Sequence, residues 1–381
     1  MRTNPVTCFQ NHASLSFKAK RRDWLKLAIA GTAAPLFGQS GANQSAKPLH
    51  VLDELDPANI KLSHRVSIRA TDDDLLFLKQ IGLRFFRAEI PNDASLAEIA
   101  QARDRFASYG ITMWSAAHYG HTTLDIALGR PGAARDQDIE RCLEIIRLFG
   151  RLGVHVAVLD WLPANTFTTA IVERRGYRTR EFSLPDFRSR FDKTRFDREY
   201  SSQEIWEAFT YFLRAVLPVA EQANVKLAMH PSDPPVVETM NGVGRIFRGY
   251  EDYRRAEELA GNSSSWGVRL CVGTWAEGGQ DMGENVFEMI HDFGSRGKIY
   301  DVDFRNVSSP LPVFQETFPD EGYMDMYQVM RALREVKYAG TMVPDHVPGL
   351  AGDEGLVQRA GTAYCIAHMR ALLRRANEEV G

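Results

Sequence analysis

From residue 59 to its end, the chain alternates short runs rich in β-branched and aromatic residues with longer amphipathic stretches. The short runs have the length and composition of strands. We expect eight: IKLSHRV (60–66), RFFRAEI (84–90), TMWSAAH (112–118), HVAVLDW (155–161), VKLAMH (225–230), GVRLCVG (267–273), IYDVDFRNV (299–307) and TMVPDH (341–346). This alternation predicts parallel strands joined by crossover helices.

The stretches between the strands have helical periodicity, as in SLAEIAQARDRFASYG (95–110), DIERCLEIIRLFGRLG (138–153) and MDMYQVMRALREVKYAG (324–340). In the first and last of these we expect Gly110 and Gly340 to supply the left-handed stop of a helix. Eight strand–helix units over about 320 residues have the number and size of a (β/α)8 TIM barrel, which we assign as a single domain over 47–381. A doubly wound open sheet is the alternative, but the first strand lacks the glycine-rich turn that binds dinucleotides.

Charge is divided unevenly along the chain. Residues 1–46 hold six of the 46 basic residues and one of the 49 acidic ones, which leaves 40 basic and 48 acidic residues in the remainder. An acidic body with scattered charges has no basic face for nucleic acid or for an anionic membrane. We therefore expect neither as a partner of the mature protein.

The basic N-terminal segment has the order of a bacterial export signal. Arg21 and Arg22 precede an apolar run (25–37), and small polar residues follow. The arginine pair resembles the twin-arginine type of signal. The run is too short to span a bilayer comfortably, so we expect cleavage near Ala42 or Ala46 and a periplasmic protein. A basic N-terminal arm or a short membrane anchor is the alternative.

Cysteine usage gives no sign of a disulfide framework. Cys8 would leave with the signal, and the three that remain, Cys142, Cys271 and Cys365, are odd in number and widely spaced. Paired structural cysteines are not implied even in an oxidising compartment.

Metal-binding residue types gather at the ends of four consecutive predicted strands, where barrel enzymes carry their reacting groups. His230 ends the fifth strand, Cys271 lies near the end of the sixth, Asp303 lies in the seventh, and Asp345 is at the end of the eighth. An imidazole, a thiolate and two carboxylates suit a divalent transition metal. A single cysteine or histidine is more often structural, but four equivalent positions predict a metal site, for which we prefer Mn²⁺ or Fe²⁺.

Five motifs give the sequence a family resemblance: MHPSDPP (229–235), CVGTW (271–275), FRNV (304–307), MDMYQVMRAL (324–333) and PDHVPG (344–349). Their order and spacing resemble the mannonate dehydratases, metal-dependent lyases on a xylose-isomerase-like TIM barrel. The resemblance is strongest over 225–350, and DWLPANTFT (160–168) is similar to the family's strand-four loop. It implies conversion of D-mannonate to 2-keto-3-deoxy-D-gluconate.

The resemblance also implies roles for particular residues. The metal ligands would be His230, Cys271, the residue at 303 and Asp345, with His346 and Arg305 beside the sugar acid. Two positions depart from the family: Asp303 stands where the family has histidine, and Gln315 precedes Glu316 where a histidine is usual. These departures predict a different substrate, a different metal or lost activity.

Dehydrating a sugar acid removes a weakly acidic proton beside the carboxylate and expels a neighbouring hydroxyl. We assign proton transfer to His346, Tyr323 and Asp345, and a bidentate grip on the carboxylate to Arg305. An ordinary loop tyrosine and a structural ion pair are the alternatives for Tyr323 and Arg305. Other candidates for substrate contacts, each with a structural alternative, are His64, His118, Asp160, Trp275 and Asn306.

An arginine-rich and aromatic-rich insertion, residues 164–200, separates the fourth strand from its helix. Insertions at this place emerge on the active face of a barrel, so we expect a lid or a contact within a homo-oligomer; a solvated loop is the alternative. The leading hypothesis is an exported metal-dependent sugar-acid dehydratase with a small-molecule sugar acid as its partner. There are two alternative hypotheses. One is a metal-dependent sugar isomerase or epimerase, and the other is an inactive periplasmic sugar-acid binding protein.

Overall fold

The computed structural model describes residues 53–118, 123–163, 167–353 and 358–380. The predicted export signal, residues 1–46, lies outside these ranges and stays a prediction. No helix within the described ranges is long and apolar enough to cross a membrane. Cys142, Cys271 and Cys365 are buried free thiols, as expected.

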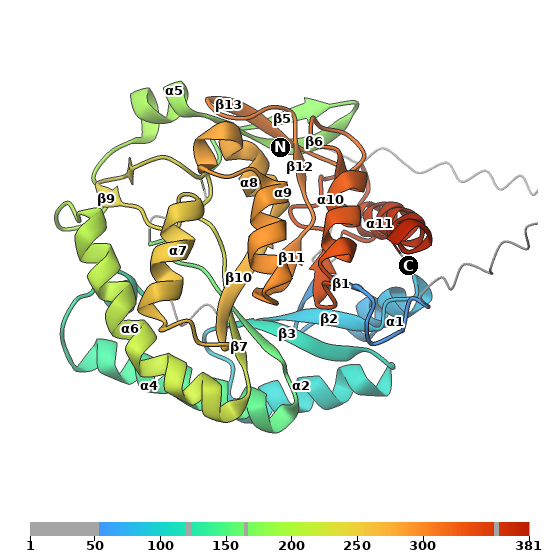
Figure 1. Ribbon diagram of the computed structural model, residues 1–381, viewed down its shortest axis with the longest axis horizontal. Helices are drawn as coiled ribbons and strands as arrows, with labels where there is room; N and C mark the ends of the chain where they lie inside the picture. Colours follow the sequence, from blue (N-terminus) through green and yellow to red (C-terminus); the bar gives the residue numbers. More distant parts are fainter. Residues whose placement is uncertain (1–52, 119–122, 164–166, 354–357, 381) are drawn as a thin grey trace, which may run out of the picture. The chain divides into compact units, whose positions relative to one another are not determined.

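Eight parallel strands close into a barrel (Figure 1). They are β1 (Lys61–Ser67), β2 (Phe85–Ile90), β3 (Thr112–His118), β4 (Val156–Leu159), β7 (Lys226–Met229), β10 (Trp266–Cys271), β11 (Ile299–Asp303) and β14 (Thr341–Val343). Each pairs with the next in this order, and β14 closes the barrel against β1, with Lys61 opposite Thr341. The predicted (β/α)8 fold is confirmed, and the open sheet is excluded.

Several predicted strands end earlier than expected, and two of these ends matter most for the site. Strand β10 stops at Cys271 because the next residues begin a helix, α8 (Val272–Gly278). The predicted strand 299–307 is two strands, since β11 ends at Asp303 and β12 (Asn306–Val307) belongs to another sheet. Cys271 and Asp303 are the last residues of adjacent strands and lie in register.

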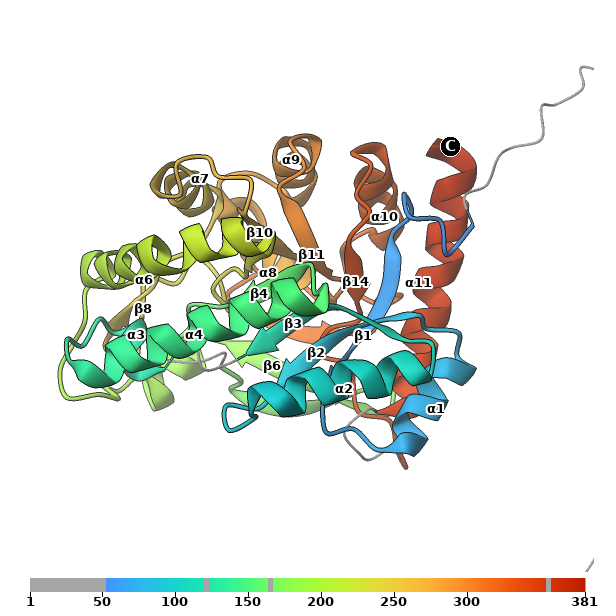
Figure 2. The ribbon, with the colours of Figure 1, turned by 90° about the horizontal axis from the view of Figure 1, so that it is seen from below.

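Helices surround the barrel strands (Figures 1 and 2). They are α1 (Asp72–Gln80), α2 (Leu96–Ser108), α3 (Leu124–Ala127), α4 (Ala133–Leu152), α6 (Ser202–Ala223), α7 (Tyr250–Leu259), α8, α9 (Val286–Met289), α10 (Met326–Glu335) and α11 (Arg359–Val380). Helix α6 follows the insertion and begins with a capping box between Ser201 and Glu204, which satisfies two N-terminal backbone donors. Its buried face packs against α4.

The structure confirms one of the two glycines that were predicted to end a helix in the left-handed conformation. Gly110 follows α2 with φ of +75°, as predicted. The prediction for Gly340 is wrong, because Lys337 takes the left-handed position with φ of +58° and α10 ends at Glu335. The remaining chain from Lys337 to Gly340 turns directly into β14.

Polar contacts cross the interior of the barrel. The Nη1 atom of Arg87 on β2 lies 3.3 Å from Oδ1 of Asp301 on β11, and the hydroxyls of Ser115 on β3 and Thr341 on β14 lie 3.3 Å apart. Neither pair of strands is adjacent in the barrel, so these contacts span its lumen. The apolar core lies mainly between strands and helices, where, for example, Phe86 stacks on Phe106 of α2.

A second, antiparallel sheet lies beside the barrel in the order β12–β13–β6–β5. The predicted insertion supplies its hairpin, β5 (Ala170–Arg174) and β6 (Tyr177–Ser183), and β6 pairs with β13 (Val313–Thr317) (Figure 1). Phe182 and Phe314 pack together between these strands. The described part of the insertion is therefore folded.

Short elements complete the described part of the chain. They are α5 (Leu184–Asp186), β8 (Thr239–Met240), β9 (Val243–Gly244), a 3-10 turn (Gly279–Met282) and two π turns (Phe187–Phe191 and Ile290–Gly294).

Candidate metal centre

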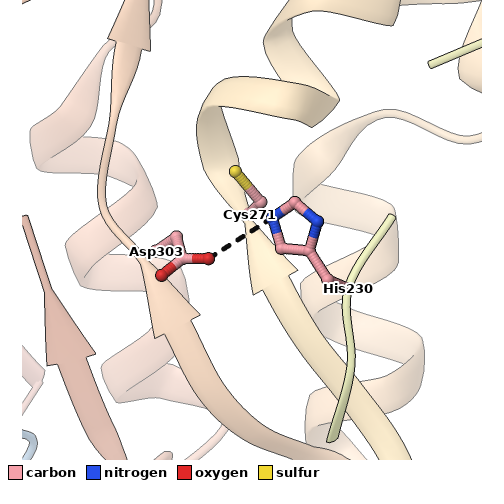
Figure 3. Close-up of side chains that lie close together, drawn as sticks. All are labelled: His230, Cys271 and Asp303. Carbon is pink, nitrogen blue, oxygen red and sulfur yellow. Dashed lines mark ion pairs between the residues drawn. The ribbon is translucent and has the colours of Figure 1, made fainter. Parts of the chain in front are cut away.

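Three of the four predicted metal ligands meet at neighbouring strand ends. His230 directly follows β7, Cys271 ends β10 and Asp303 ends β11. All three are buried, and one ligand atom from each lies within 4.8 Å of the others. Figure 3 shows the imidazole, the sulfur and the carboxylate converging from the three strand ends. The barrel register brings them together, because parallel neighbours end at the same rim.

Local contacts orient two of these ligands. Nδ1 of His230 lies 2.6 Å from the carbonyl oxygen of Pro231, which can only accept, so Nδ1 carries a proton and Nε2 faces Asp303 at 3.4 Å. A backbone carbonyl on the far ring nitrogen is the usual partner of a metal-binding histidine. The sulfur of Cys271 accepts hydrogen bonds from the backbone nitrogen and hydroxyl of Thr274, at 3.4 and 3.1 Å.

Electrostatics around the cluster favours a cation. Burial and Arg269 lower the pKa of His230, but contacts with Asp303 and Cys271 outweigh them and raise it to about 9. The negative partners thus attract a positive charge, and a divalent metal at Nε2 would replace the proton. An imidazole, a thiol and a carboxylate, each buried and oriented to one point, fit such an ion.

Asp303 has additional partners that the sequence did not reveal. Its Oδ1 accepts from Nη1 of Arg87 at 2.7 Å, and its Oδ2 lies 2.7 Å from Nε of Arg269. Burial alone would raise the pKa of Asp303, but the two arginines hold it well below its usual range. The only signal of this pair was an arginine inside a predicted strand, Arg87 in RFFRAEI and Arg269 in GVRLCVG.

Asp345, the fourth predicted ligand, lies near the cluster but is not one of its three converging residues. Its Oδ1 accepts from Arg65 at 2.9 Å, and its Oδ2 lies 3.5 Å from Nε of Arg305. Burial raises the pKa of Asp345, whereas the neighbouring His346 and arginines lower it by more. The carboxylate is therefore ionised beside the three candidate ligands.

Arg305 is enclosed, contrary to the predicted grip on a substrate carboxylate. Its guanidinium donates to Glu277, lies 3.1 Å from Asp233 and 3.4 Å from Glu316, and is 3.5 Å from the sulfur of Cys271. Its side chain has no exposed surface. The structural alternative is the one that the structure supports, and Arg305 positions the sulfur and the surrounding carboxylates.

His346 and Glu316 form a pair beside this network. Nδ1 of His346 lies 2.7 Å from Oε1 of Glu316, and Nε2 lies 3.4 Å from Nη1 of Arg180. Arginine can only donate, so Nε2 accepts and Nδ1 donates its proton to Glu316. His346 also has φ of +48°, a conformation that is costly for a residue with a side chain and is common at functional sites. The pair therefore presents a basic nitrogen in a fixed orientation.

A pocket of about 680 Å³ opens at this point. One wall is the hairpin β5–β6, with Arg178 and Arg180, and the other is the loop after β14 (344–353). His64 on β1 also lines it, together with His346. A chain of contacts links the pocket to the three converging residues. His346 contacts Glu316, Glu316 contacts Arg305, and Arg305 contacts the sulfur of Cys271.

The remaining candidates mostly have structural contacts. Trp275 is 1% exposed, packs against Tyr253 and donates to the carbonyl oxygen of Glu284, so a sugar cannot stack on it. Asn306 is buried, and its side chain bonds the backbone of Met324 and Val307 instead of facing the pocket. Both predictions of substrate contact are corrected, because packing and backbone donors occupy these side chains.

Two other candidates, Tyr323 and Asp160, lie outside the pocket lining. The hydroxyl of Tyr323 donates to the carbonyl oxygen of Ala276, and burial raises its pKa. Asp160 follows β4 and lies 3.9 Å from Arg269. His118 ends β3, and its side chain is not among those described. Among the sequence candidates whose side chains are described, His64 and His346 are the ones that line the pocket.

Comparisons with known proteins agree with the geometry. A family model described as D-mannonate dehydratase (UxuA) matches residues 176–378. The mannonate dehydratase of Thermotoga neapolitana is 30% identical over 289 residues, which is 65% of this chain and 78% of the relative. The crystal structure of mannonate dehydratase from Streptococcus suis serotype 2 has a TM-score of 0.72 and 26% identity, covering 84% of this chain and 96% of that one. A xylose isomerase domain protein from Planctomyces limnophilus, at 11% identity and TM-score 0.53 over 83% and 98% of the two chains, supports the fold alone.

Proposed function

The chain belongs to the D-mannonate dehydratase family, and from this premise we propose that it is a metal-dependent hydro-lyase that converts D-mannonate to 2-keto-3-deoxy-D-gluconate. The observation that carries the proposal is the convergence of His230, Cys271 and Asp303 beside a pocket that contains His346. The family match covers all of these residues.

We propose that His230, Cys271 and Asp303 hold the metal and that Asp345 lies beside it. A divalent ion here supplies a Lewis acid for the negative charge that develops on the substrate. Mn²⁺ or Fe²⁺ is our preference, because a carboxylate in place of the family's histidine favours a harder ion than zinc. The two arginines on Asp303 keep that ligand ionised and fixed.

The chain's own residues account for the proton movements. In the overall reaction the C2–H and C3–O bonds break, water leaves, and the enol becomes the 2-keto acid. Nε2 of His346 takes the C2 proton, and Glu316 stabilises the resulting imidazolium through Nδ1 at 2.7 Å. The same nitrogen then protonates the departing hydroxyl, so that His346 ends the cycle neutral.

The test is a direct assay of product. Purified protein loaded with Mn²⁺ or Fe²⁺ is incubated with D-mannonate, and formation of a 2-keto-3-deoxy acid is followed with time. We expect turnover that chelation abolishes and metal restores. Absence of this product with either metal would overturn the proposed reaction. Parallel incubations with neutral aldoses and ketoses would detect isomerase or epimerase activity.

We also propose that the protein is exported to the periplasm through a twin-arginine signal in residues 1–46, of which Arg21 and Arg22 are the essential pair. The mature domain then begins near residue 47. Cells that express Arg21→Lys/Arg22→Lys should retain the protein in the cytoplasm. Equal periplasmic amounts of this variant and the wild type would contradict the signal.

A further inference from the structure

The pocket face of the hairpin carries two arginines that have no acidic partner among the described residues. Along β6, Tyr177 and Thr179 are buried, whereas Arg178 and Arg180 are exposed and line the pocket. Residues two apart on a strand share a face, so both guanidiniums lie on the same side of the hairpin. Neither forms an ion pair with any described residue.

From this arrangement we propose that Arg178 and Arg180 form the subsite that binds the carboxylate of the sugar acid. The proposal rests on the proposed function, whose substrate is an acid, and it gives the hairpin the role that the sequence suggested for Arg305. The planar guanidinium fork of an arginine matches the geometry and charge of a carboxylate, and this face of the hairpin carries two.

The backbone holds these arginines in place. Arg178 exchanges two backbone hydrogen bonds with Gly349 in the opposite wall, at 2.9 and 2.8 Å. The hydroxyl of Thr179 donates to the carbonyl oxygen of Glu316 at 2.8 Å, and that of Tyr177 donates to Glu321 at 2.8 Å. The strand is therefore fixed to both β13 and the loop after β14, and the side chains start from a rigid base.

The acidic residues that line the pocket leave this positive charge largely uncompensated. Glu316 is engaged by His346, and Asp353 accepts from the backbone nitrogens of Ala360 and Gly361. Glu173 lies opposite Arg178 in the hairpin, but the two form no ion pair. A ligand carboxylate would complete the charge balance on this face.

The position of Arg180 explains how such a subsite serves the reaction. Its Nη1 lies 3.4 Å from Nε2 of His346, the proposed base. A carboxylate held by Arg180 therefore brings the next carbon of the substrate, C2, to the side of His346. The subsite places the proton that must be removed beside the group that removes it, and it selects acids over neutral sugars, which have no group for the guanidiniums.

The experiment compares Arg178→Gln, Arg180→Gln and the double variant with the wild type, all loaded with metal. The matched control is Arg190→Gln, since Arg190 is exposed, lies in the same insertion and does not line the pocket. Calorimetric titration gives Kd for D-mannonate and a panel of related sugar acids, and for D-mannitol as an uncharged probe. Steady-state assays give kcat and KM separately.

We expect the Kd for sugar acids to rise about tenfold in each single variant and by more in the double variant. The reason is that each substitution removes charge-assisted hydrogen bonds to the carboxylate. Mannitol binding and the Arg190→Gln control should change less than about twofold. Arg180→Lys should recover only part of the affinity, because lysine lacks the planar fork. KM should rise more than kcat falls.

Failure of the subsite and failure of the proposed function give different results. Turnover of D-mannonate with unchanged Kd and KM in the double variant overturns the subsite and leaves the reaction standing. Binding of sugar acids that depends on both arginines, without turnover, supports the subsite and overturns the reaction. A wild type that binds no sugar acid in the panel overturns both.

Discussion

Two groups of arginines, one around the candidate metal centre and one in the pocket wall, differ sharply in their surroundings. Arg87, Arg269 and Arg305 are buried and face carboxylates of the barrel and of the loops above it. Arg178 and Arg180 are exposed on the hairpin and form no ion pair with any described residue. The first group has its partners built into the fold, and the second leaves its charge for a ligand.

The difference shows what each group can do. A buried arginine whose donors are already engaged stabilises and orients its partners, and exchanging one partner for a substrate would leave a charge unpaired in a region of low dielectric. An exposed arginine without an acidic partner gives up mainly water when it binds a substrate carboxylate, which costs much less. Substitutions should therefore affect folding in the first group and ligand binding in the second.

The largest effect should come from Arg305→Met. The apolar side chain would leave Glu277, Asp233 and Glu316 close together without their shared cation. We expect a loss of about 3–5 kcal/mol in the free energy of unfolding, measured by urea denaturation. Arg190→Gln is the exposed control and should stay within about 0.5 kcal/mol. Equal stability of the two variants would remove the distinction between buried and hairpin arginines.

Arg305 also shows where sequence reasoning reaches its limit. The eight strands were predictable because β-rich runs and helical periodicity are local signals, and His230, Cys271 and Asp303 followed because parallel strands end at one rim. The acidic partners of Arg305 come from helix α8, strand β13 and the loops that follow β7 and β14. Nothing in the local pattern distinguishes an arginine that faces a pocket from one that is enclosed by such partners.

The second sheet could not be predicted from the sequence for the same reason. The pairing of β6 with β13 joins segments separated by more than a hundred residues, with Phe314 opposite Phe182, and neither segment shows this partner in its own sequence. The composition of the insertion indicated a lid or contact surface but not a hairpin register. That register decides which arginines face the pocket, so the proposed carboxylate subsite needed the structure.

Asp303→His should have the next largest effect. The change restores the family's residue, but it takes from Arg87 and Arg269 the carboxylate that both contact. We expect a loss of about 3 kcal/mol in stability and a shift in preference from Mn²⁺ toward Zn²⁺, since imidazole is the softer ligand. Metal affinities and urea denaturation measure the two effects.

Adding Arg269→Gln to this variant sharpens the comparison. If Asp303 and Arg269 are coupled, the double variant should recover at least about 1 kcal/mol relative to the sum of the single changes. Additive losses would show that Asp303 and Arg269 act independently. An unchanged ratio of Mn²⁺ to Zn²⁺ affinity in Asp303→His would refute the ligand role of Asp303.

His230→Ala should weaken metal binding with a smaller effect on folding. Removing one of three converging ligands should lower metal affinity about tenfold or more, since loss of even an indirect partner has an effect of that size. His155→Ala is the matched control, because His155 directly precedes β4, at the opposite end of the barrel, where its ring packs against Trp114. Metal analysis of protein purified without chelator should separate the two; equal metal content would remove His230 from the site.

A surface ion pair extends the comparison to an arginine that contributes little. Asp74 in α1 accepts from Thr71 at the helix start and from Arg359 at 2.9 Å, and Arg359 is half exposed. Burial opposes these contacts, yet together they lower the pKa of Asp74 below its usual value. Asp74→Asn should reduce stability at pH 7 by about 1 kcal/mol or less, the range of partly exposed pairs and helix caps.

The pH dependence of this difference tests its electrostatic origin. Because the folded pKa of Asp74 is below the unfolded one, the folded state binds fewer protons, and the contribution is fully present above the unfolded pKa and lost as pH falls through the folded pKa. The stability of Asp74→Asn should therefore approach that of the wild type as the pH is lowered below about 4. Asp73→Asn is the control, since Asp73 is exposed in the same helical turn and has no part in the capping box. A stability difference for Asp74→Asn that stays constant from pH 7 to acid would mean that hydrogen bonding of the neutral side chain, and not its charge toward Arg359, holds this end of α1.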